Sequence, residues 1–326
     1  MVLQGEESVN CYTGALSYLM RKQGIGVREP EIWNIGKGLK ICIGYDEYGL
    51  PEICFDFKKT VSTFLNEINC RIEEIEYDAR NLPNQLAAIL QRKNVICWIN
   101  SKYCTYSRIY TTVSGTLHSF LLEEIYDNGE MKIADFLIPE SPIIAVREII
   151  NIENLLKGIQ DKVATSLFNE IHCFHILHSD YYKPYDRSLG LLRIKENAEE
   201  CLRQIDEERG VQEYADKCIE ILQESDWKGQ CRLLKKMYDN IKVSPVLPMK
   251  LLHLQMMKNF GYNQDVILCG MDLINQWKAT ASYILKQFVI ISEAELKMSH
   301  SILNRYFSEL ILKEEYFWSG INKGVL

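Results

Sequence analysis

The sequence has no long apolar segment and no excess of positive charge. Its apolar runs, such as residues 288–291, are far too short to cross the roughly 30 Å hydrocarbon core of a bilayer. The formal net charge is −7 at pH 7, whereas a non-specific nucleic-acid binder needs a basic face to neutralise phosphates. We therefore expect a protein that binds neither membranes nor nucleic acid.

The sequence also lacks an export signal and a closely spaced cysteine pair. The first ten residues, MVLQGEESVN, contain neither the basic segment nor the apolar core of a secretory signal, so we expect a cytoplasmic protein. The 11 cysteines are scattered, odd in number and nowhere spaced as Cys-x-x-Cys. In a reducing compartment most cysteines are small buried residues, and a chemical role for any one of them requires a specific local context.

The first half of the chain mixes strand and helix patterns. Residues 95–100 (VICWIN) form a short apolar run typical of a buried strand. Residues 116–136 predict two strands around Asp127-Asn128-Gly129, because such a turn sequence favours a hairpin. Apolar residues at helical spacing predict three helices in the same half, which are residues 10–23, 61–68 and 83–92.

After about residue 150 the strand patterns fade and amphipathic helical periodicity takes over. No internal repeat, low-complexity tract or Gly/Ser linker separates the two halves. We therefore predict an α+β fold, with a mixed domain over residues 1–150 and an all-α domain over residues 151–326. The helical patterns of the second half cover residues 189–208, 212–224, 228–242, 249–260 and 266–313.

Cys11 lies at the start of the first predicted helix, directly after the polar segment Ser8-Val9-Asn10. A helix start offers unpaired backbone N–H groups and the positive end of the helix dipole, which favour a thiolate over a thiol. The same N–H groups can hold the oxyanion of a tetrahedral intermediate. Cys11 is therefore a candidate nucleophile, and the alternative is a buried cysteine at a helix start.

The predicted hairpin contains a proton partner for this thiol. His118 begins the first strand and Asp135 lies near the end of the returning strand, so the turn brings the two together. A carboxylate that accepts from an imidazole fixes its tautomer and stabilises the imidazolium. We therefore predict a catalytic triad of Cys11, His118 and Asp135. Glu123 and Glu124 are weaker choices for the carboxylate because they lie on the histidine strand itself.

Three short motifs resemble a known family of enzymes: NCYTGAL at 10–16, LHSFLLEE at 117–124 and KIADF at 132–136. They look like papain-like cysteine enzymes, and they are closest to C39-like peptidases and to the N-terminal domain of the butirosin-biosynthesis acyltransferase family. The resemblance implies a papain-like fold over residues 1–150. It also implies Cys11 as the nucleophile, His118 as base and acid, and Asp135 as the orienting group.

Members of the butirosin-type family transfer an acyl chain from a carrier-protein thioester to an amine. Related papain-fold amide synthases act in nonribosomal assembly of thioamides such as closthioamide. The resemblance thus implies a cysteine-dependent acyltransferase or amide synthase of antibiotic-type secondary metabolism, with an acyl or peptidyl carrier protein as donor and a small amine as acceptor. The helical domain at 151–326 would cover or shape the substrate site and favour aminolysis by excluding water.

Two alternatives to acyl transfer stay open at this point. One is a peptidase or thioesterase that uses the same triad, and the other is a non-catalytic interaction protein of the same fold. The oxyanion donor is also open, with Gln4 the first candidate and Asn10 the second. The sequence departs from the family at Asn10-Cys11-Tyr12, where C39-like peptidases usually have Asp-Cys-Gly, and at Phe136, where a proline is common.

The segment HCFHILH contains four side chains of metal-ligating type, which are His172, Cys173, His175 and His178. On a helix the three histidines would spread over roughly 120°, and no second ligand pair follows. We therefore expect a packed histidine cluster or a pocket wall there, and no metal or cofactor. The tyrosine-rich residues 103–110 could line an acyl channel or simply pack between domains.

Overall fold

The chain forms two compact units in the computed structural model. Unit 1 comprises residues 1–32 and 65–184, and unit 2 comprises residues 33–64 and 185–326. The structure describes residues 2–46, 48–78, 80–91, 95–112, 116–138, 144–161, 173–208, 210–243, 245–294 and 300–323, with backbone alone for residues 2–7, 112, 144 and 208.

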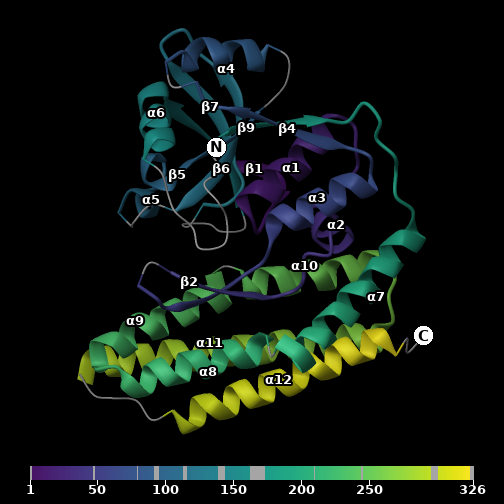
Figure 1. Ribbon diagram of the computed structural model, residues 1–326, viewed down its shortest axis with the longest axis vertical. Coiled ribbons are helices and arrows are strands. Elements are labelled where there is room, and N and C mark those ends of the chain that lie inside the picture. Colours follow the sequence, from purple (N-terminus) through teal and green to yellow (C-terminus); the bar gives the residue numbers. More distant parts are fainter. Residues whose placement is uncertain are drawn as a thin grey trace. The chain divides into compact units, whose positions relative to one another are not determined.

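Unit 1 is built on a seven-stranded sheet in the order β1-β8-β7-β6-β5-β9-β4 (Figure 1). Every neighbouring pair in it is antiparallel. Together with the helices, this sheet confirms the mixed α and β class expected from the sequence. The strands are β1 (Val2–Glu7), β4 (Arg71–Glu76), β5 (Val95–Asn100), β6 (Leu117–Ile125), β7 (Glu130–Asp135), β8 (Ile144–Asn151) and β9 (Cys173–His178).

Helices cover both faces of this sheet. On one face, Leu86 and Leu155 belong to a buried apolar cluster with Cys97, Phe120 and Ile133 of the strands. On the other face, α1 contacts the central strands β5, β6, β7 and β9. The helices of unit 1 are α1 (Cys11–Lys22), α4 (Leu82–Leu90), α5 (Arg108–Thr112) and α6 (Ile152–Gln160), while α2 (Glu29–Ile35) and α3 (Phe57–Glu67) cross the division between the units.

The hairpin of β6 and β7 has the register that places the predicted site residues at one end. Leu121 lies opposite Ala134, and Gly129 in the turn adopts a φ of 80°, a backbone conformation that suits glycine. His118 at the start of β6 and Asp135 at the end of β7 therefore lie at the same end of neighbouring strands. The predicted hairpin is confirmed.

Unit 2 consists of helices and one small two-stranded ribbon. Asp186 and Asp226 begin two of the helices, because their carboxylates accept from the backbone N–H of Leu189 and Gly229. The helices are α7 (Arg187–Arg203), α8 (Gly210–Glu224), α9 (Trp227–Tyr238), α10 (Val246–Asn259), α11 (Gln264–Ala294) and α12 (Ser301–Asn322), and the ribbon pairs β2 (Cys42–Tyr45) with β3 (Pro51–Cys54). π-Helical turns follow α7 at Gln204–Glu208 and α9 at Asp239–Val243.

Two features differ from what the sequence indicated. Residues 173–178 form strand β9 and not a helix, because Phe174 and Ile176 alternate into the sheet core while Cys173 and His175 face the other way. The boundary between unit 1 and unit 2 also does not lie between residues 150 and 151. Strand β9 pairs with β4 and β5 inside unit 1, and residues 33–64 join unit 2, where β2 and β3 contact α8.

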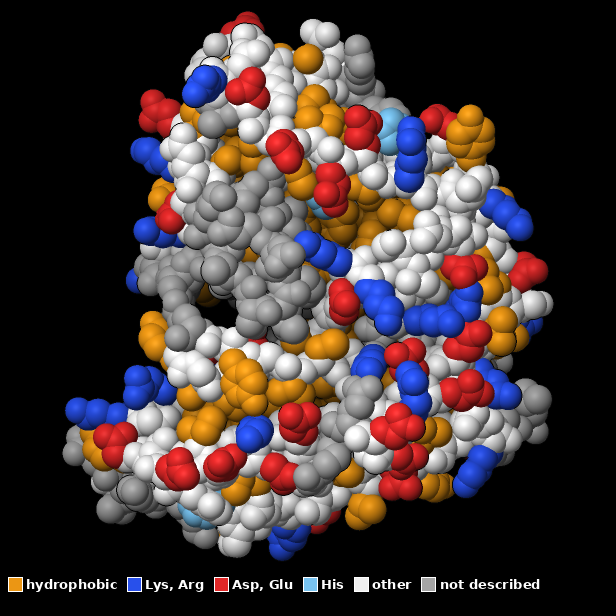
Figure 2. Space-filling model, viewed as in Figure 1, with side chains coloured by type: hydrophobic (Ala, Val, Ile, Leu, Met, Phe, Trp, Pro, Cys, Tyr) orange, Lys and Arg blue, Asp and Glu red, His pale blue; other side chains and the backbone are white. Residues whose placement is uncertain are grey.

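The helices of the described residues include none with both the length and the apolar character needed to cross a membrane. On the face drawn in Figure 2, acidic and basic side chains are mixed.

Candidate active site

Cys11 is the first residue of α1 and lies beneath the surface, with 8% of its area exposed. The preceding Asn10 caps the helix, because its side-chain oxygen accepts from the backbone N–H of Tyr12 and Thr13. This cap uses the oxygen of Asn10 and leaves the sulfur of residue 11 at the positive end of the helix dipole. The sequence prediction of Cys11 at a helix start is confirmed.

A buried carboxylate holds the chain just before Cys11. Glu29, at the start of α2, accepts from the backbone N–H of Val9 at 3.0 Å and of Asn10 at 3.1 Å. It also accepts from the hydroxyl of Thr13 at 2.5 Å. Glu29 is 3% exposed, so these bonds are shielded from water and fix the path of the chain into α1.

Gly14 allows the first turn of α1 to approach the end of β7. A Cβ atom at this position would lie 2.0 Å from the Oγ of Ser8 and 2.8 Å from the Cβ of Phe136. Both distances are too short for any side chain. Because Phe136 directly follows Asp135, the absence of a side chain at residue 14 brings the cysteine helix close to the strand that carries the carboxylate.

His118 and Asp135 form a buried pair at this end of the sheet. The Nε2 of His118 lies 2.9 Å from the Oδ2 of Asp135, and the two side chains are 3% and 0% exposed. Asp135 also accepts from the hydroxyl of Tyr106 at 2.6 Å and from the backbone N–H of Leu137 at 3.0 Å. These donors hold both carboxylate oxygens, so the carboxylate in turn fixes the orientation of the imidazole.

Tyr110 contacts the other nitrogen of the imidazole. Its hydroxyl lies 3.3 Å from the Nδ1 of His118 and donates to the backbone carbonyl of Leu137. A hydroxyl has one proton, so towards Nδ1 it can only accept. Its position therefore suits an imidazole that carries a proton on Nδ1, as an imidazolium does.

Cys11 and His118 are electrostatically coupled. Burial opposes ionisation of the thiol, but the charge and hydrogen bond of His118 hold the pKa of Cys11 below its usual 9.0. Burial likewise opposes the imidazolium, but the carboxylate of Asp135 and the thiolate of Cys11 raise the pKa of His118 to about 10. Both shifts favour a thiolate paired with an imidazolium over a neutral thiol and imidazole, and a thiolate is the reactive form of a cysteine.

The structure adds residues that the sequence did not single out. The side chain and backbone of Ser119 help to hold the pKa of Cys11 down. Tyr106 and Tyr110 contact Asp135 and His118 directly, although the sequence offered only a channel or packing role for their segment. Glu29 and Glu31 both lie in the first turn of α2, and acidic residues at a helix start are too common for sequence alone to single out Glu29.

The predicted site residues have four different outcomes. Cys11, His118 and Asp135 come together in unit 1. Asn10 is the helix cap, and an oxyanion role for its amide nitrogen stays a prediction. Gln4 belongs to β1, whose side chains lie outside the described part of the chain. Glu123, the weaker carboxylate candidate, is bound to Lys22 and Arg147 instead.

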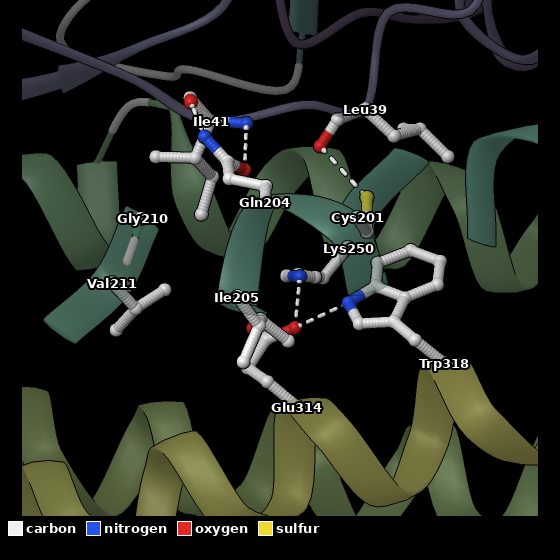
Figure 3. Close-up of a pocket in the computed structure, with 10 residues that line it drawn as sticks. All are labelled: Leu39, Ile41, Cys201, Gln204, Ile205, Gly210, Val211, Lys250, Glu314 and Trp318. Carbon is white, nitrogen blue, oxygen red and sulfur yellow. Dashed lines mark hydrogen bonds and ion pairs between the residues drawn. The ribbon is translucent and has the colours of Figure 1, made fainter. Parts of the chain in front are cut away.

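Unit 2 contains a separate small cavity of about 20 Å³ (Figure 3). Inside it, the ammonium of Lys250 lies 2.7 Å from Glu314, which also accepts from the indole nitrogens of Trp277 and Trp318 at 2.7 Å each. The cavity has the volume of about one water molecule, so it does not suit an acyl substrate. The satisfied ion pair makes it part of the core of unit 2.

No model of a known protein family and no curated protein matches this chain.

Proposed function

We propose that the protein is a cysteine-dependent acyltransferase that forms amide bonds, with Cys11, His118 and Asp135 as its catalytic residues. The observation that carries the proposal is the thiol at the start of α1 coupled to an imidazole that a buried carboxylate holds. A helix that carries a cysteine and packs on an antiparallel sheet that carries the histidine also supports the papain-like fold implied by the sequence motifs.

The reaction proceeds in two halves. In the first, the thiolate of Cys11 attacks the carbonyl carbon of an acyl thioester, and the departing thiolate takes a proton from the imidazolium of His118. The enzyme is then acylated on sulfur and His118 is neutral. In the second half an amine attacks the acyl carbon, His118 accepts the amine proton, and the C–S bond breaks to release the amide and restore the ion pair.

The environment of His118 supports this use in both directions. Asp135 stays hydrogen-bonded to Nε2, so the proton moves on and off Nδ1, the nitrogen that faces away from the carboxylate. The tetrahedral oxyanion needs donors near the first turn of α1. We propose the backbone N–H of Cys11, with Gln4 as the first side-chain candidate and the amide nitrogen of Asn10 as the second.

The donor, the acceptor and the biological setting follow from the sequence resemblance and belong to the same proposal. The donor is the thioester of an acyl or peptidyl carrier protein, and the acceptor is a small amine. The setting is cytoplasmic biosynthesis of a nonribosomal-type secondary metabolite. An all-α region over the C-terminal part of the chain would supply specificity for these partners.

The test is incubation of the protein with a small acyl thioester, with and without a set of primary amines. Intact-mass spectrometry detects the acyl-enzyme and chromatography separates amide from free acid. The proposal expects an acyl adduct on Cys11 and amide as the main product when amine is present. Cys11→Ala should give neither, whereas Cys70→Ala is the matched control, since burial raises the pKa of the Cys70 thiol to about 11.

Each other outcome contradicts acyl transfer in its own way. An acyl-enzyme that yields only acid at every amine concentration would assign the triad to a thioesterase or peptidase. No adduct on Cys11, with the remaining cysteines reacting equally slowly, would indicate a non-catalytic protein of this fold.

A further inference from the structure

A second group of reactive side chains lies at the edge of the sheet in unit 1. Glu74 of β4 and His175 of β9 are directly opposite each other in the register, and Cys173 lies two residues along β9 on the same face. The Nε2 of His175 is 3.2 Å from the sulfur of Cys173 and 3.7 Å from the Oε1 of Glu74. All three potential ligand atoms lie within 4.8 Å of one another.

The separations from His175 are close to those of a tetrahedral zinc site. With ordinary Zn–S, Zn–N and Zn–O bonds of about 2.3, 2.0 and 2.1 Å, tetrahedral angles place sulfur, nitrogen and oxygen ligands about 3.4 to 3.6 Å apart. The two measured separations from His175 lie on either side of that range. The side chain of Glu74 is 69% exposed, so its carboxylate can rotate to complete the site.

The surroundings of His175 already fix its ring for coordination. Its Nδ1 lies 2.7 Å from the hydroxyl of Tyr12, and the edge of its ring meets the Tyr12 ring with centroids 5.3 Å apart. A metal-bound histidine usually donates its second ring N–H to a nearby oxygen, which leaves the other nitrogen as a ligand, and the hydroxyl of Tyr12 can accept such a bond. Tyr12 therefore points Nε2 at Cys173 and Glu74.

The charge balance also favours a divalent ion. A thiolate from Cys173 and the carboxylate of Glu74 together neutralise Zn²⁺, and His175 binds as a neutral ligand. Cys173 and His175 are 7% and 5% exposed, whereas Glu74 lies at the surface. The ion would thus have three protein ligands and a fourth position open towards solvent, the arrangement of a zinc site that keeps an exchangeable ligand.

We propose that Glu74, Cys173 and His175 form a binding site for Zn²⁺ on the α1 face of the sheet. Binding releases the proton of the Cys173 thiol and forms a Zn–S bond, a Zn–N bond to Nε2 of His175 and a Zn–O bond to Glu74. Because Tyr12 follows the proposed nucleophile in the chain and bonds to His175, the ion would also tie the first turn of α1 to the sheet edge. This site is independent of the acyltransferase proposal.

The test is titration with Co²⁺, which takes zinc sites and gives an absorption band when a thiolate binds it. The full chain with Cys11→Ala is used, because the pair of Cys11 and His118 also offers a sulfur and a nitrogen. The proposal expects a cobalt–thiolate band that saturates at one equivalent and is displaced by Zn²⁺. It also expects thermal unfolding of this variant to shift to higher temperature with added Zn²⁺.

Variants in the same background decide the assignment. Cys173→Ser should abolish the band, and Glu74→Gln, a change at an exposed position, should weaken Co²⁺ binding about tenfold or more. His178→Ala is the matched control, because His178 pairs with Glu73 at 2.5 Å on the same two strands without a thiol, and it should leave the band unchanged. No band in the Cys11→Ala protein, a band that survives Cys173→Ser, or one insensitive to Glu74→Gln would overturn the proposal.

Discussion

Replacement of His118 by glutamine should move the ionisation of Cys11 across neutral pH. In the native protein burial opposes the thiolate, and the imidazolium outweighs it and lowers the pKa of Cys11. Glutamine carries no charge, so the variant retains the burial and loses the main opposing effect. The pKa of Cys11 should then rise above its ordinary value of 9.0.

The size of the effect follows from these two states. The pKa of His118 is raised to about 10, so the imidazolium that stabilises the thiolate persists through neutral pH. At pH 7, two pH units below the ordinary thiol pKa of 9.0, about 1% of a thiol is ionised, and a thiol with a higher pKa is ionised less. We therefore expect the thiolate content of Cys11 at pH 7 to fall in His118→Gln, to about 1% or less.

Ultraviolet absorbance of the thiolate measures this content at equilibrium. The signal of Cys11 is the difference between each protein and its Cys11→Ala counterpart, followed from pH 5 to pH 9. The subtraction cancels the absorbance of the other cysteines, and Cys70 and Cys201 titrate above this range, because burial raises their pKa values to about 11 and about 12. The difference signal therefore reports the thiolate of Cys11.

Two results would refute the reasoning. One is a native difference signal that appears only with a midpoint at or above pH 9, since the thiol would then be unactivated. The other is a native-like midpoint in His118→Gln, which would mean that the helix dipole or Ser119, and not the imidazole, sustains the thiolate. Circular dichroism on each variant confirms that the fold is retained.

Three further changes have defined outcomes. Asp135→Asn should lower kcat for acyl transfer by about 10⁴ with little change in KM. The amide nitrogen of asparagine cannot accept, so it would face either His118 at one carboxylate position or the Leu137 N–H at the other. Equal rates in the two proteins would disprove an orienting role. Gly14→Ala should lower the free energy of unfolding, measured in urea, by about 1–3 kcal/mol, because the added methyl group would overlap Ser8 and Phe136. Glu314→Ala should cost about 3–5 kcal/mol in the same assay by stranding the buried ammonium of Lys250, whereas exposed Glu315→Ala should stay within about 0.5 kcal/mol.

The parts of the site that could be predicted from sequence depend on local signals. The helix that begins at Cys11 follows a capping asparagine, and the turn that ends in Gly129 fixes the hairpin of His118 and Asp135. Both signals act within a few residues, so they survive in a single sequence. Together they bring out the three residues of the proposed triad.

The remaining contacts depend on long-range packing. Tyr106 and Tyr110 reach Asp135 and His118 from the segment after β5, and no periodicity indicates where their hydroxyls point. The pattern of β9 is ambiguous, because a run of six residues is too short to separate a strand from a helix. Its pairing with Glu74 follows only from the strand register, which local sequence does not specify.

The hydrogen bonds of Glu29 to the backbone ahead of α1 determine which substitutions residue 9 tolerates. The carboxylate binds the amide N–H of Val9 and not its side chain, so many residues can replace this valine without loss of the hydrogen bond that positions the chain before Cys11. Proline is the exception, because it has no amide hydrogen to donate. A glutamate-to-glutamine change at position 29 would have a wider effect than its conservative nature suggests, since its carboxylate accepts from two amides and a hydroxyl at once.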